Sequence, residues 1–312
     1  MIDVVIVNWN SGFQLRDCLV SLRDFCLGEV SSVVIVDNDS VDGSLVALKS
    51  EGDWPFELRV IKNPVNVGFG AACNQGSVGK SKYLLFLNPD TRVYANTVKR
   101  PLAFLESPVN SKIGVVGVQL RDEFGRVSHS CSRFPKIIFF VSQMFGINRL
   151  RRFRRFSQVM AEWAHDETRE VDQVMGAFFL IRRELFEDLG GFDERYFVYF
   201  EEVDLSYRAF EKGWKTVFIS DVHAFHAAGG TSRQVKAHRL FYSLRSRLLY
   251  GFKHFSRLNA FLLAGLTLCV EPVTRSLLSL SRGELDSVRN TLRGYGMLYR
   301  DLPALIVRVR ER

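Results

Sequence analysis

Cysteine is scarce in this chain, and the pattern of the five that occur excludes several kinds of protein. They are odd in number, widely spaced and without a CxxC pair, which argues against a disulfide framework or a zinc site and favours reduced thiols in a cytosolic compartment. A mean hydropathy of +0.01 argues against a protein with many membrane spans. The first residues run directly into a strand-like segment, so we expect no secretory signal.

Two common nucleotide-binding motifs are also missing. A third glycine at position 73 would complete GxGxxG after Gly68 and Gly70, but Cys73 stands there, and GxxxxGK[ST] is absent. A dinucleotide dehydrogenase or a P-loop enzyme is therefore disfavoured. Gly68 and Gly70 would still let the backbone approach a phosphate or a sugar closely.

The net charge of +8 is unevenly distributed. Residues 231–312 contain 15 Lys and Arg against 5 Asp and Glu, a balance of +10, which leaves −2 for residues 1–230. A neutral to acidic body with a basic tail suggests chemistry in the body and attachment to an anionic surface in the tail. No nucleic-acid partner is expected, because the arginines lie among apolar positions and match no known reader motif.

Apolar strand-like runs alternate with helical spacing through the first hundred residues. The expected strands are 4–7, 33–36, 58–61 and 83–87, with helices around 15–22, 45–48 and 70–78. This pattern indicates an α/β fold with a parallel sheet covered on both faces. Further strands are expected at 113–120, 171–181 and 216–219, a mobile or acceptor-side insertion at 121–170, and helices from residue 230 to the end.

Polar clusters follow three of the expected strands, at the sheet edge where such folds bind ligands. They are Asn8-Trp9-Asn10, Asp37-Asn38-Asp39-Ser40 and Asn88-Pro89-Asp90. The Asp37 cluster could accept from a pyrimidine N–H and bind ribose hydroxyls, or it could cap the next helix. Asp90 could hold Mg²⁺ or Mn²⁺ against a diphosphate, or it could form an Asx turn.

Three carboxylates follow an aromatic-rich segment. On a helix Glu201 and Asp204 would share one face, and Glu202 would turn about 100° away. Desolvation raises a carboxylate pKa, which suits a general base near neutral pH, although all three could simply occupy a helix's first turn. Downstream, His226 precedes Gly229-Gly230-Thr231-Ser232. It could complete a metal shell or touch a diphosphate, or it could be structural.

Taken in order, these motifs resemble those of family 2 glycosyltransferases, and within them the bacterial rhamnosyltransferases of O-antigen and cell-wall assembly. The resemblance rests on Val7-Asn8-Trp9-Asn10-Ser11, Val36-Asp37-Asn38-Asp39-Ser40, Asn66-Val67-Gly68-Phe69, Leu87-Asn88-Pro89-Asp90, Gly190-Gly191-Phe192-Asp193-Glu194, Glu201-Glu202-Val203-Asp204-Leu205 and His226. It covers roughly residues 1–235. Each motif alone is weak, whereas the whole ordered series is specific.

The resemblance implies a GT-A fold, a Rossmann-like, mixed and mostly parallel sheet flanked by helices, in a catalytic domain over residues 1–232. Residues 233–312 would form a basic, amphipathic helical C-terminal region. Asp37 would contact the pyrimidine, and Asp90 and His226 would bind the divalent cation, Mg²⁺ or Mn²⁺. Nucleotide-sugar contacts are implied for Val7, Asn8, Asn10, Asp37, Asn38, Ser40, Asn66, Gly68, Phe69, Asn74 and Asn88.

Two positions depart from the family pattern. Asn88 replaces the first Asp of a full DxD motif, so one metal ligand is neutral. The base position holds Glu202 where the family's ED motif has Asp, which leaves Asp204 and Glu201 as alternative bases. The implied reaction is a single in-line displacement that inverts the anomeric carbon.

The implied donor is dTDP-L-rhamnose, and the implied acceptor is a hydroxyl of a polyprenyl-diphosphate-linked glycan at the cytoplasmic face of the plasma (inner) membrane. The alternatives are a UDP- or GDP-sugar donor, as in galactosyl- or galactofuranosyltransferases, and a nucleotide-diphosphate-binding protein without turnover. The apolar run 258–270, 13 residues long, is too short to span a bilayer. With basic and apolar residues at 245–257 it suggests an interfacial amphipathic helix and peripheral membrane contact, against a helical subdomain packed on the core.

Overall fold

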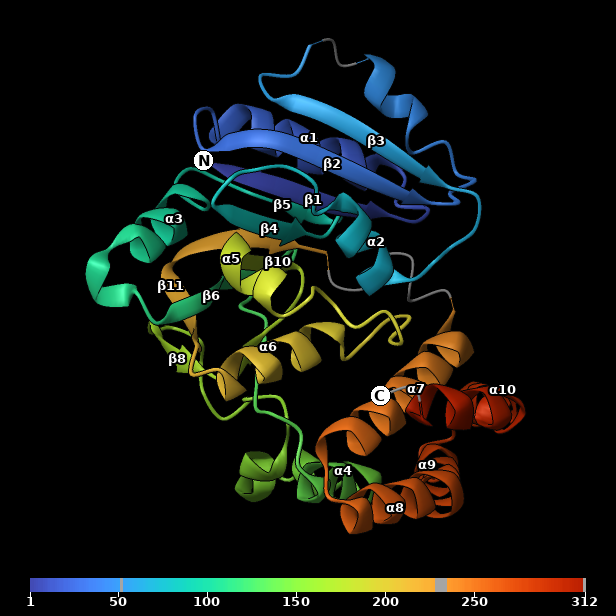
Figure 1. Ribbon diagram of the computed structural model, residues 1–312. Helices are drawn as coiled ribbons and strands as arrows, with labels where there is room; N and C mark the ends of the chain where they lie inside the picture. Colours follow the sequence, from blue (N-terminus) through green and yellow to red (C-terminus); the bar gives the residue numbers. More distant parts are fainter. Residues whose placement is uncertain (51–52, 228–234, 311–312) are drawn as a thin grey trace. The chain divides into compact units, whose positions relative to one another are not determined.

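The computed structural model describes residues 1–50, 53–227 and 235–310, and the chain divides into two compact units (Figure 1). The first, the sheet unit, comprises Met1–Arg133, Trp163–Glu194 and Glu201–Thr231. The second, the helical unit, comprises Phe134–Glu162, Arg195–Phe200 and Ser232–Arg312. Two earlier segments of the chain therefore belong with the C-terminal helices.

A nine-stranded sheet forms the centre of the sheet unit, in the order β3-β2-β1-β4-β10-β6-β11-β5, with β8 paired to β11. Its strands are β1 (Ile2–Asn8), β2 (Val30–Asn38), β3 (Glu57–Asn63), β4 (Tyr83–Leu87), β5 (Thr91–Arg92), β6 (Ile113–Arg121), β8 (Arg169–Val171), β10 (Phe178–Arg182) and β11 (Lys215–His226). Strands β3, β2, β1, β4, β6 and β11 run in one direction, and β10, β5 and β8 run in the other. The expected mixed, mostly parallel sheet is confirmed.

Helices cover both faces of this sheet. Those of the sheet unit are α1 (Phe13–Phe25), η1 (Val46–Ser50), α2 (Phe69–Gly76), α3 (Lys99–Glu106), η2 (Pro108–Asn110), α5 (Arg183–Asp188) and α6 (Glu201–Glu211). Side chains alternate along a strand, so Val4 shares a core with Leu15 of α1 while Val5 faces α2. A Cβ on Gly76 would lie 2.5 Å from Cγ1 of Val5 and 3.0 Å from Cγ2 of Val36, so glycine permits the close approach of α2.

The prediction of a single strand over residues 171–181 is wrong. The segment forms β8, then β9 (Gln173–Val174), which pairs with β7 (Cys131–Ser132) in a separate two-stranded sheet, and then β10, antiparallel between β4 and β6. Exposed Asp172 and Met175 interrupt the apolar run, and each piece pairs with a different strand. The expected insertion at 121–170 contains β7 and the short helices α4, η3 and η4.

The helical unit is built from eight helical segments of the described chain. They are α4 (Ile137–Met144), η3 (Ile147–Arg149), η4 (Arg151–Phe156), α7 (Lys236–His254), α8 (Arg257–Gly265), the π-helical turn η6 (Leu266–Val270), α9 (Glu271–Leu280) and α10 (Leu285–Arg310). Segments α8, η6 and α9 follow one another directly, so one helix runs over Arg257–Leu280. The sequence predicts that the apolar segment ends before Glu271, whereas the helix continues through Glu271 to Leu280.

Glu271 does not interrupt this helix because its charge is neutralised inside the unit. The side chain is 2% exposed and pairs with Arg247 of α7 and, at 2.9 Å, with Arg275 one turn later. Burial raises the pKa of a carboxyl group, but Arg247 and Arg275 outweigh it and hold the pKa of Glu271 below its ordinary value. Glu271 is therefore a structural ion-pair centre on the inner face of the helix.

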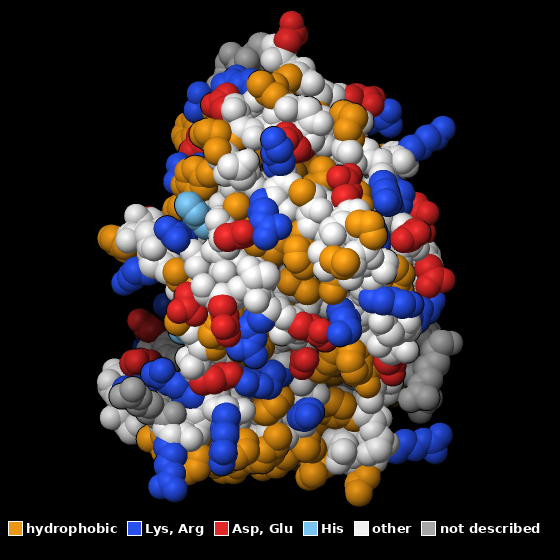
Figure 2. All heavy atoms as spheres, turned by 90° about the vertical axis from the view of Figure 1, so that its left-hand side faces the viewer, with side chains coloured by type: hydrophobic (Ala, Val, Ile, Leu, Met, Phe, Trp, Pro, Cys, Tyr) orange, Lys and Arg blue, Asp and Glu red, His pale blue; other side chains and the backbone are white. Residues whose placement is uncertain are grey.

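The exposed apolar surface of the helical unit matches the expectation only in part. In α7, Arg245, Leu248, Leu249 and Tyr250 are buried, so this stretch belongs to the interior of the unit. Within the expected run 258–270, Leu258, Phe261 and Leu262 are exposed. The other exposed apolar side chains of the described part of the unit are Ile138, Phe145, Ile147, Leu150, Val159, Val273, Leu277, Leu280, Leu285, Leu292, Tyr299, Ile306 and Val307. Figure 2 shows hydrophobic side chains gathered at the lower end of the view, the end at which Figure 1 draws α4, α8 and α9.

Candidate active site

Asn8, at the carboxyl end of β1, joins the polar residues that follow β2. Its side-chain nitrogen lies 2.5 Å from Asp37 Oδ1, 3.1 Å from Ser40 Oγ and 2.8 Å from Ser44 Oγ. Its side-chain oxygen accepts a hydrogen bond from Ser11 Oγ. The parallel register places Asn8 opposite Asp37, so the two strand ends meet at one edge of the sheet.

Asn10 fixes the loop after β1 against the loop after β2. Its backbone N–H donates to Ser40 Oγ at 2.9 Å, and its Oδ1 accepts from the Val41 N–H at 2.8 Å. Asn10 and Asp39 have φ of 51° and 62°, a left-handed region that Asn and Asp tolerate better than other side chains. Both loops therefore turn sharply at the sheet edge.

A cavity of about 300 Å³ opens beside these loops. It is lined by Asp37, Asp39, Ser40, Gly43, Ser44, Leu45, Val46, Lys62 and Asn63. Six of these nine residues carry a polar or charged side chain, and convergent polar groups of this kind fix the orientation of a small ligand. Sequence reasoning missed Lys62 and Asn63. Both residues end β3, so the same rule that selected the ends of β1 and β2 could have found them.

Asn38 connects this edge to the start of α2. Its Nδ2 donates to the Gly68 carbonyl at 3.1 Å, and its Oδ1 accepts from Asn63 at 2.8 Å. Asn66 Oδ1 accepts from the Gly68 N–H at 2.9 Å. Gly68 has a φ of 93°, which a residue with a side chain rarely adopts, and Phe69 then begins α2. The predicted residues Asn38, Asn66, Gly68 and Phe69 thus form one connected turn.

Asn74 lies elsewhere on α2 and holds a different turn. It exchanges two hydrogen bonds of 2.9 Å with the backbone N–H and carbonyl of Phe192, and donates to Glu194 at 3.0 Å. Gly190 and Gly191, with φ of 71° and 74°, form the preceding turn. Asn74 therefore anchors the Gly190–Glu194 turn, and a direct contact with the nucleotide sugar stays a prediction.

Asp90 and His226 are brought together although they are far apart in the sequence. His226 pairs with Thr91 where β11 meets β5, and its Nε2 lies 3.4 Å from Asp90 Oδ1. The Ala227 N–H donates to the Asp90 carbonyl at 3.1 Å. The side chains of Asp90 and His226 are 12% and 7% exposed, respectively. The adjoining Gly229–Ser232 loop lies outside the described residues.

The Asp90–His226 pair places a carboxylate oxygen and an imidazole nitrogen side by side, two groups of the kinds that bind metal ions. Within the described part of the chain, no group of three or more His, Cys, Asp and Glu side chains could hold a metal. Two protein ligands nevertheless fit Mg²⁺ or Mn²⁺ in a phosphate-transfer site, because these ions complete their shells with phosphate oxygens and water. A mixed carboxylate and imidazole set suits Mn²⁺ better than Mg²⁺.

Glu201 and Glu202 begin α6, and neither carboxylate forms an ion pair within the described residues. One oxygen of each carboxylate is buried and has no hydrogen-bond partner within the described residues. Burial raises the pKa of Glu201 well above its ordinary value, and repulsion from Glu202 adds to this. Burial also raises the pKa of Glu202, which backbone N–H groups of the first helical turn offset only in part.

Asp204 has a different environment on the same helix. Its side chain is fully buried, and Oδ2 accepts from Arg208 Nε at 2.8 Å. The same guanidinium donates to the carbonyls of Leu189 and Gly191 at 2.6 and 2.8 Å. Asp204 therefore orients the arginine that closes the turn after α5. This position is occupied by structural contacts rather than open to a substrate.

The acidic helix and the Asn88–Asp90 turn meet at one short segment before β10. The Ala177 carbonyl accepts from the Asn88 N–H at 3.1 Å and from Thr91 Oγ1 at 3.3 Å. The neighbouring Gly176 faces Glu202, whose Cγ would lie 3.9 Å from a Cβ at that position. Two adjacent residues thus contact both halves of the candidate site.

The start of α2 completes this arrangement. A Cβ on Gly70 would lie 3.6 Å from Cβ of Glu201, so the glycine-rich turn after Asn66 borders the acidic helix. The ends of β1, β2 and β4, the turn before α2 and the start of α6 therefore belong to one region of the sheet unit. Such a region, at the carboxyl ends of parallel strands, is where α/β folds bind their ligands.

The chain belongs to glycosyl transferase family 2, because the model of that family matches residues 3–190. It is a glycosyltransferase, and the family expected from the motifs is confirmed. The matched region contains the strand-end clusters and Asp90 but ends before Glu202.

Two curated relatives are named rhamnosyltransferases. An N-acetylglucosaminyl-diphospho-decaprenol L-rhamnosyltransferase of Mycobacterium tuberculosis is 28% identical over 257 residues, which cover 76% of this chain and 80% of the relative. Rhamnosyltransferase WbbL of Escherichia coli K12 is 29% identical over 170 residues, covering 54% of this chain and 61% of the relative.

Solved structures share the fold. The mannosyltransferase PcManGT from Pyrobaculum calidifontis, in complex with GDP-Man and Mn²⁺, has a TM-score of 0.56 at 16% identity and covers 99% of this chain and 84% of its own. TarS 1-349 of S. aureus, in complex with UDP-GlcNAc, has a TM-score of 0.55 at 16% identity, covering 95% and 91%. The expected GT-A fold is confirmed.

Proposed function

We propose that this glycosyltransferase transfers L-rhamnose from dTDP-L-rhamnose to a hydroxyl of a polyprenyl-diphosphate-linked glycan, with inversion, and that Glu202 is the general base. The position of Glu202 carries the proposal. It is partly exposed, has one carboxylate oxygen without a partner in the described chain, and faces Gly176, next to the residue that holds the Asn88–Asp90 turn. The names of both relatives support rhamnose, and the name of the mycobacterial relative supports the lipid-linked acceptor.

Glu202 is preferred over its two neighbours for reasons of access. A general base must come within hydrogen-bonding distance of the proton it removes. Glu201 is only 5% exposed. Asp204 is fully buried and forms an ion pair with Arg208. Glu202 combines partial exposure with a raised pKa, so its carboxylate is a stronger base than one in water.

The cavity at the ends of β2 and β3 is proposed to hold the nucleoside. Asp37 and Ser40 line it and offer a carboxylate and a hydroxyl to a pyrimidine N–H and to ribose hydroxyls. Lys62 supplies a positive charge at the same edge, which favours a phosphate-bearing ligand. The turn of Asn66 and Gly68 would then lie along the diphosphate and sugar.

Asp90 and His226 are proposed to hold the divalent cation, with Asn88 nearby as a neutral oxygen donor. When bound, such a cation neutralises the negative charge that develops on the departing diphosphate. Asp90 Oδ1 and His226 Nε2 lie 3.4 Å apart on adjoining backbone segments. Both side chains could therefore bind one ion without rearrangement of the sheet.

The transfer itself requires one proton movement and one substitution. Glu202 accepts the proton of the acceptor hydroxyl, and the oxygen forms a bond to the anomeric carbon. The bond from that carbon to the diphosphate oxygen breaks, and its electron pair leaves with the nucleoside diphosphate. A single displacement inverts the anomeric configuration, and the products are the glycoside, the nucleoside diphosphate and protonated Glu202.

The helical unit is proposed to attach the enzyme peripherally to the cytoplasmic face of the plasma membrane, where the lipid-linked acceptor would lie. Among the described residues, one helix, Arg257–Leu280, is long and apolar enough to cross a membrane by length and composition, with a mean hydropathy of 1.4 and 17% of its most apolar window buried. We propose that it lies in the interface, because Glu271 and Arg275 on its inner face stay paired within the unit.

A turnover screen tests the proposed function. Purified protein is incubated with dTDP-L-rhamnose, UDP-sugars and GDP-sugars, with and without Mn²⁺, and release of nucleoside diphosphate is measured. We expect Mn²⁺-dependent turnover of the dTDP donor, its near loss in Glu202→Gln, and retained activity in Glu201→Gln. Turnover of only a UDP- or GDP-sugar would overturn the donor, and a fully active Glu202→Gln beside an inactive Asp204→Asn would overturn the base.

Membrane attachment has its own test in flotation with vesicles that contain phosphatidylglycerol. Replacing Phe261 and Leu262 with serine removes two exposed apolar side chains from the outer face of α8 and should reduce the bound fraction. Replacing exposed Phe124 and Val109 of the sheet unit with serine is the matched control. Equal binding of the two double variants would contradict the proposed orientation.

A further inference from the structure

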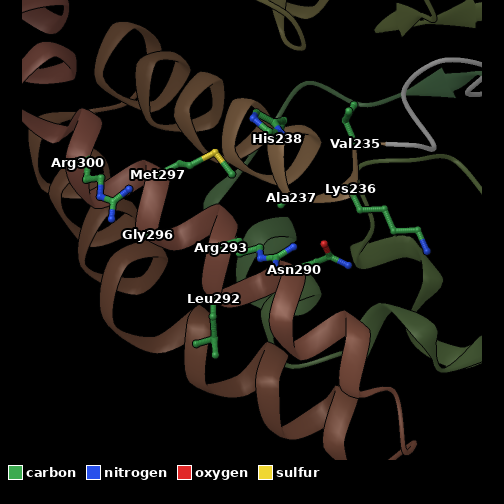
Figure 3. A pocket seen from close by; sticks show the side chains of 10 residues that line it. All are labelled: Val235, Lys236, Ala237, His238, Asn290, Leu292, Arg293, Gly296, Met297 and Arg300. Carbon is green, nitrogen blue, oxygen red and sulfur yellow. The ribbon is translucent and has the colours of Figure 1, made fainter.

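A second cavity lies within the helical unit, between the first turn of α7 and the middle of α10 (Figure 3). Its volume is about 620 Å³. It is lined by Val235, Lys236, Ala237, His238, Asn290, Leu292, Arg293, Gly296, Met297 and Arg300. None of these residues belongs to the candidate active site described above.

Two glycines of α10 explain why the cavity exists. A Cβ on Gly294 would lie 3.0 Å from the Ala237 carbonyl, so α7 and α10 are in close contact there. A Cβ on Gly296, which lines the cavity, would meet nothing within 4 Å. The two helices therefore touch at Gly294 and leave open space beside Gly296.

Apart from Asn290, the polar side chains of this lining are basic, and none of the described lining residues is a carboxylate. Lys236 and His238 come from α7, and Arg293 and Arg300 lie two helical turns apart on α10, on one face of that helix. Figure 3 shows these side chains projecting from the two helices around the cavity. An array of this kind favours an anionic ligand.

These cations differ in their partners from three other arginines of the unit. Arg245, Arg247 and Arg275 each pair with a carboxylate, Asp301 or Glu271. Within the described residues, neither Lys236 nor the two arginines of the cavity has such a partner. Like charges placed around one hollow repel each other, and a bound anion removes that repulsion.

We propose that this cavity binds the phosphate or diphosphate group of a membrane lipid. Guanidinium groups form paired hydrogen bonds with phosphate oxygens, which suits Arg293 and Arg300 to this role. The apolar side chains of Leu292 and Met297 border the same space and match the first carbons of a lipid chain. The ligand could be a prenyl diphosphate or an anionic phospholipid, and both share this chemistry.

Binding by the full-length protein tests the proposal. Affinity is measured by calorimetry for farnesyl diphosphate, a soluble prenyl diphosphate, and by flotation for vesicles with and without phosphatidylglycerol. EDTA is present throughout, so that the divalent cation proposed for Asp90 and His226 is absent. We expect Arg293→Ala/Arg300→Ala to bind at least one of the two ligands about tenfold or more weakly than the unchanged protein.

Two matched variants make the result specific. Arg289→Ala/Arg308→Ala removes the same charge from exposed positions of α10 outside the cavity, and its affinity should stay within about twofold. Gly296→Leu fills the cavity where a side chain meets no neighbour, and it should weaken binding without removing any charge. Circular dichroism and thermal unfolding check that each variant is folded.

The outcomes separate the two ligand sources. Loss of farnesyl diphosphate binding alone identifies a prenyl diphosphate site, and loss of vesicle binding alone identifies a phospholipid headgroup site. The proposal is overturned if the two double variants bind both ligands equally, or if Gly296→Leu binds both as well as the unchanged protein. No step of this test depends on turnover, so its failure and failure of the proposed transferase activity are distinguishable.

Discussion

Two buried acidic sites, one in each unit, differ in what surrounds them. Glu201 and Glu202 occupy the first turn of α6, and Glu271 lies inside the continuous helix Arg257–Leu280. Glu271 meets Arg247 and Arg275, which lower its pKa, whereas burial raises the pKa of both carboxyls in α6. Burial alone therefore does not decide the role of a carboxylate. The carboxylate with cation partners is structural, and one that meets no cation among the described residues is the proposed base.

The largest expected effect of a substitution is at Glu202. We expect Glu202→Gln to lower kcat by about 10²–10⁴, because it removes the group that accepts the acceptor proton. Stability should not fall, since a carboxylate oxygen without a partner is replaced by a neutral amide. Single-turnover kinetics and urea unfolding check both statements, with exposed Glu184→Gln as the control. A loss smaller than fivefold would assign the proton transfer to another group.

The corresponding change in the helical unit should act on stability instead. Glu271→Gln leaves buried Arg247 without its carboxylate, and breaking a buried ion pair from one side costs about 3–5 kcal/mol. Urea unfolding followed by circular dichroism measures the effect, with exposed Glu284→Gln as the control. If the two variants unfolded at the same urea concentration, the Arg247–Glu271–Arg275 cluster would have no structural role.

Asp204 provides an intermediate case inside α6 itself. Asp204→Asn weakens the contact with Arg208, which also holds the carbonyls of Leu189 and Gly191, and should cost about 1–3 kcal/mol of stability. The kcat of the folded variant should change by less than tenfold, because Asp204 does not face the acceptor. A stable but inactive Asp204→Asn protein would reverse the roles given to Glu202 and Asp204.

The smallest expected effect is the opposite pH dependence of the two sites. Glu201 has a raised pKa when folded, so its contribution to stability is present at low pH and is lost as the pH rises through that value. Glu271 has a lowered pKa, so its contribution is present above the unfolded pKa and is lost as the pH falls through the folded one. The free energy of unfolding, measured against pH, should flatten on the alkaline side in Glu201→Gln and on the acid side in Glu271→Gln. Identical profiles for the two variants would contradict the comparison.

The donor-side half of the site could be predicted from the sequence because it depends on local rules. Each apolar run of β1, β2 and β4 ends in a polar cluster, and parallel strands bring such ends together. The pairing of Asp90 with His226 was suggested by motif order, and it is realised through the register of β5 and β11. Lys62 and Asn63 were missed because β3 is only partly buried and gave a weak strand pattern.

The remaining parts depend on contacts that no local pattern contains. The choice among Glu201, Glu202 and Asp204 rests on Arg208, which pairs with only one of them. The end assigned to the apolar run at Glu271 was wrong because the neutralising Arg247 lies 24 residues earlier. Strand order around β10 likewise depends on which edges its neighbours leave free.

The anchoring of the Gly190–Glu194 turn by Asn74 has a consequence for protein engineering. The family model ends at residue 190, and the acidic helix begins eleven residues later, so this turn separates the donor-side sequence from the proposed base. A chimaera joined here keeps its geometry only if Asn74 from one parent still meets the backbone of Phe192 from the other. Exchange of acceptor preference between related transferases is therefore best attempted at this junction, with the asparagine retained.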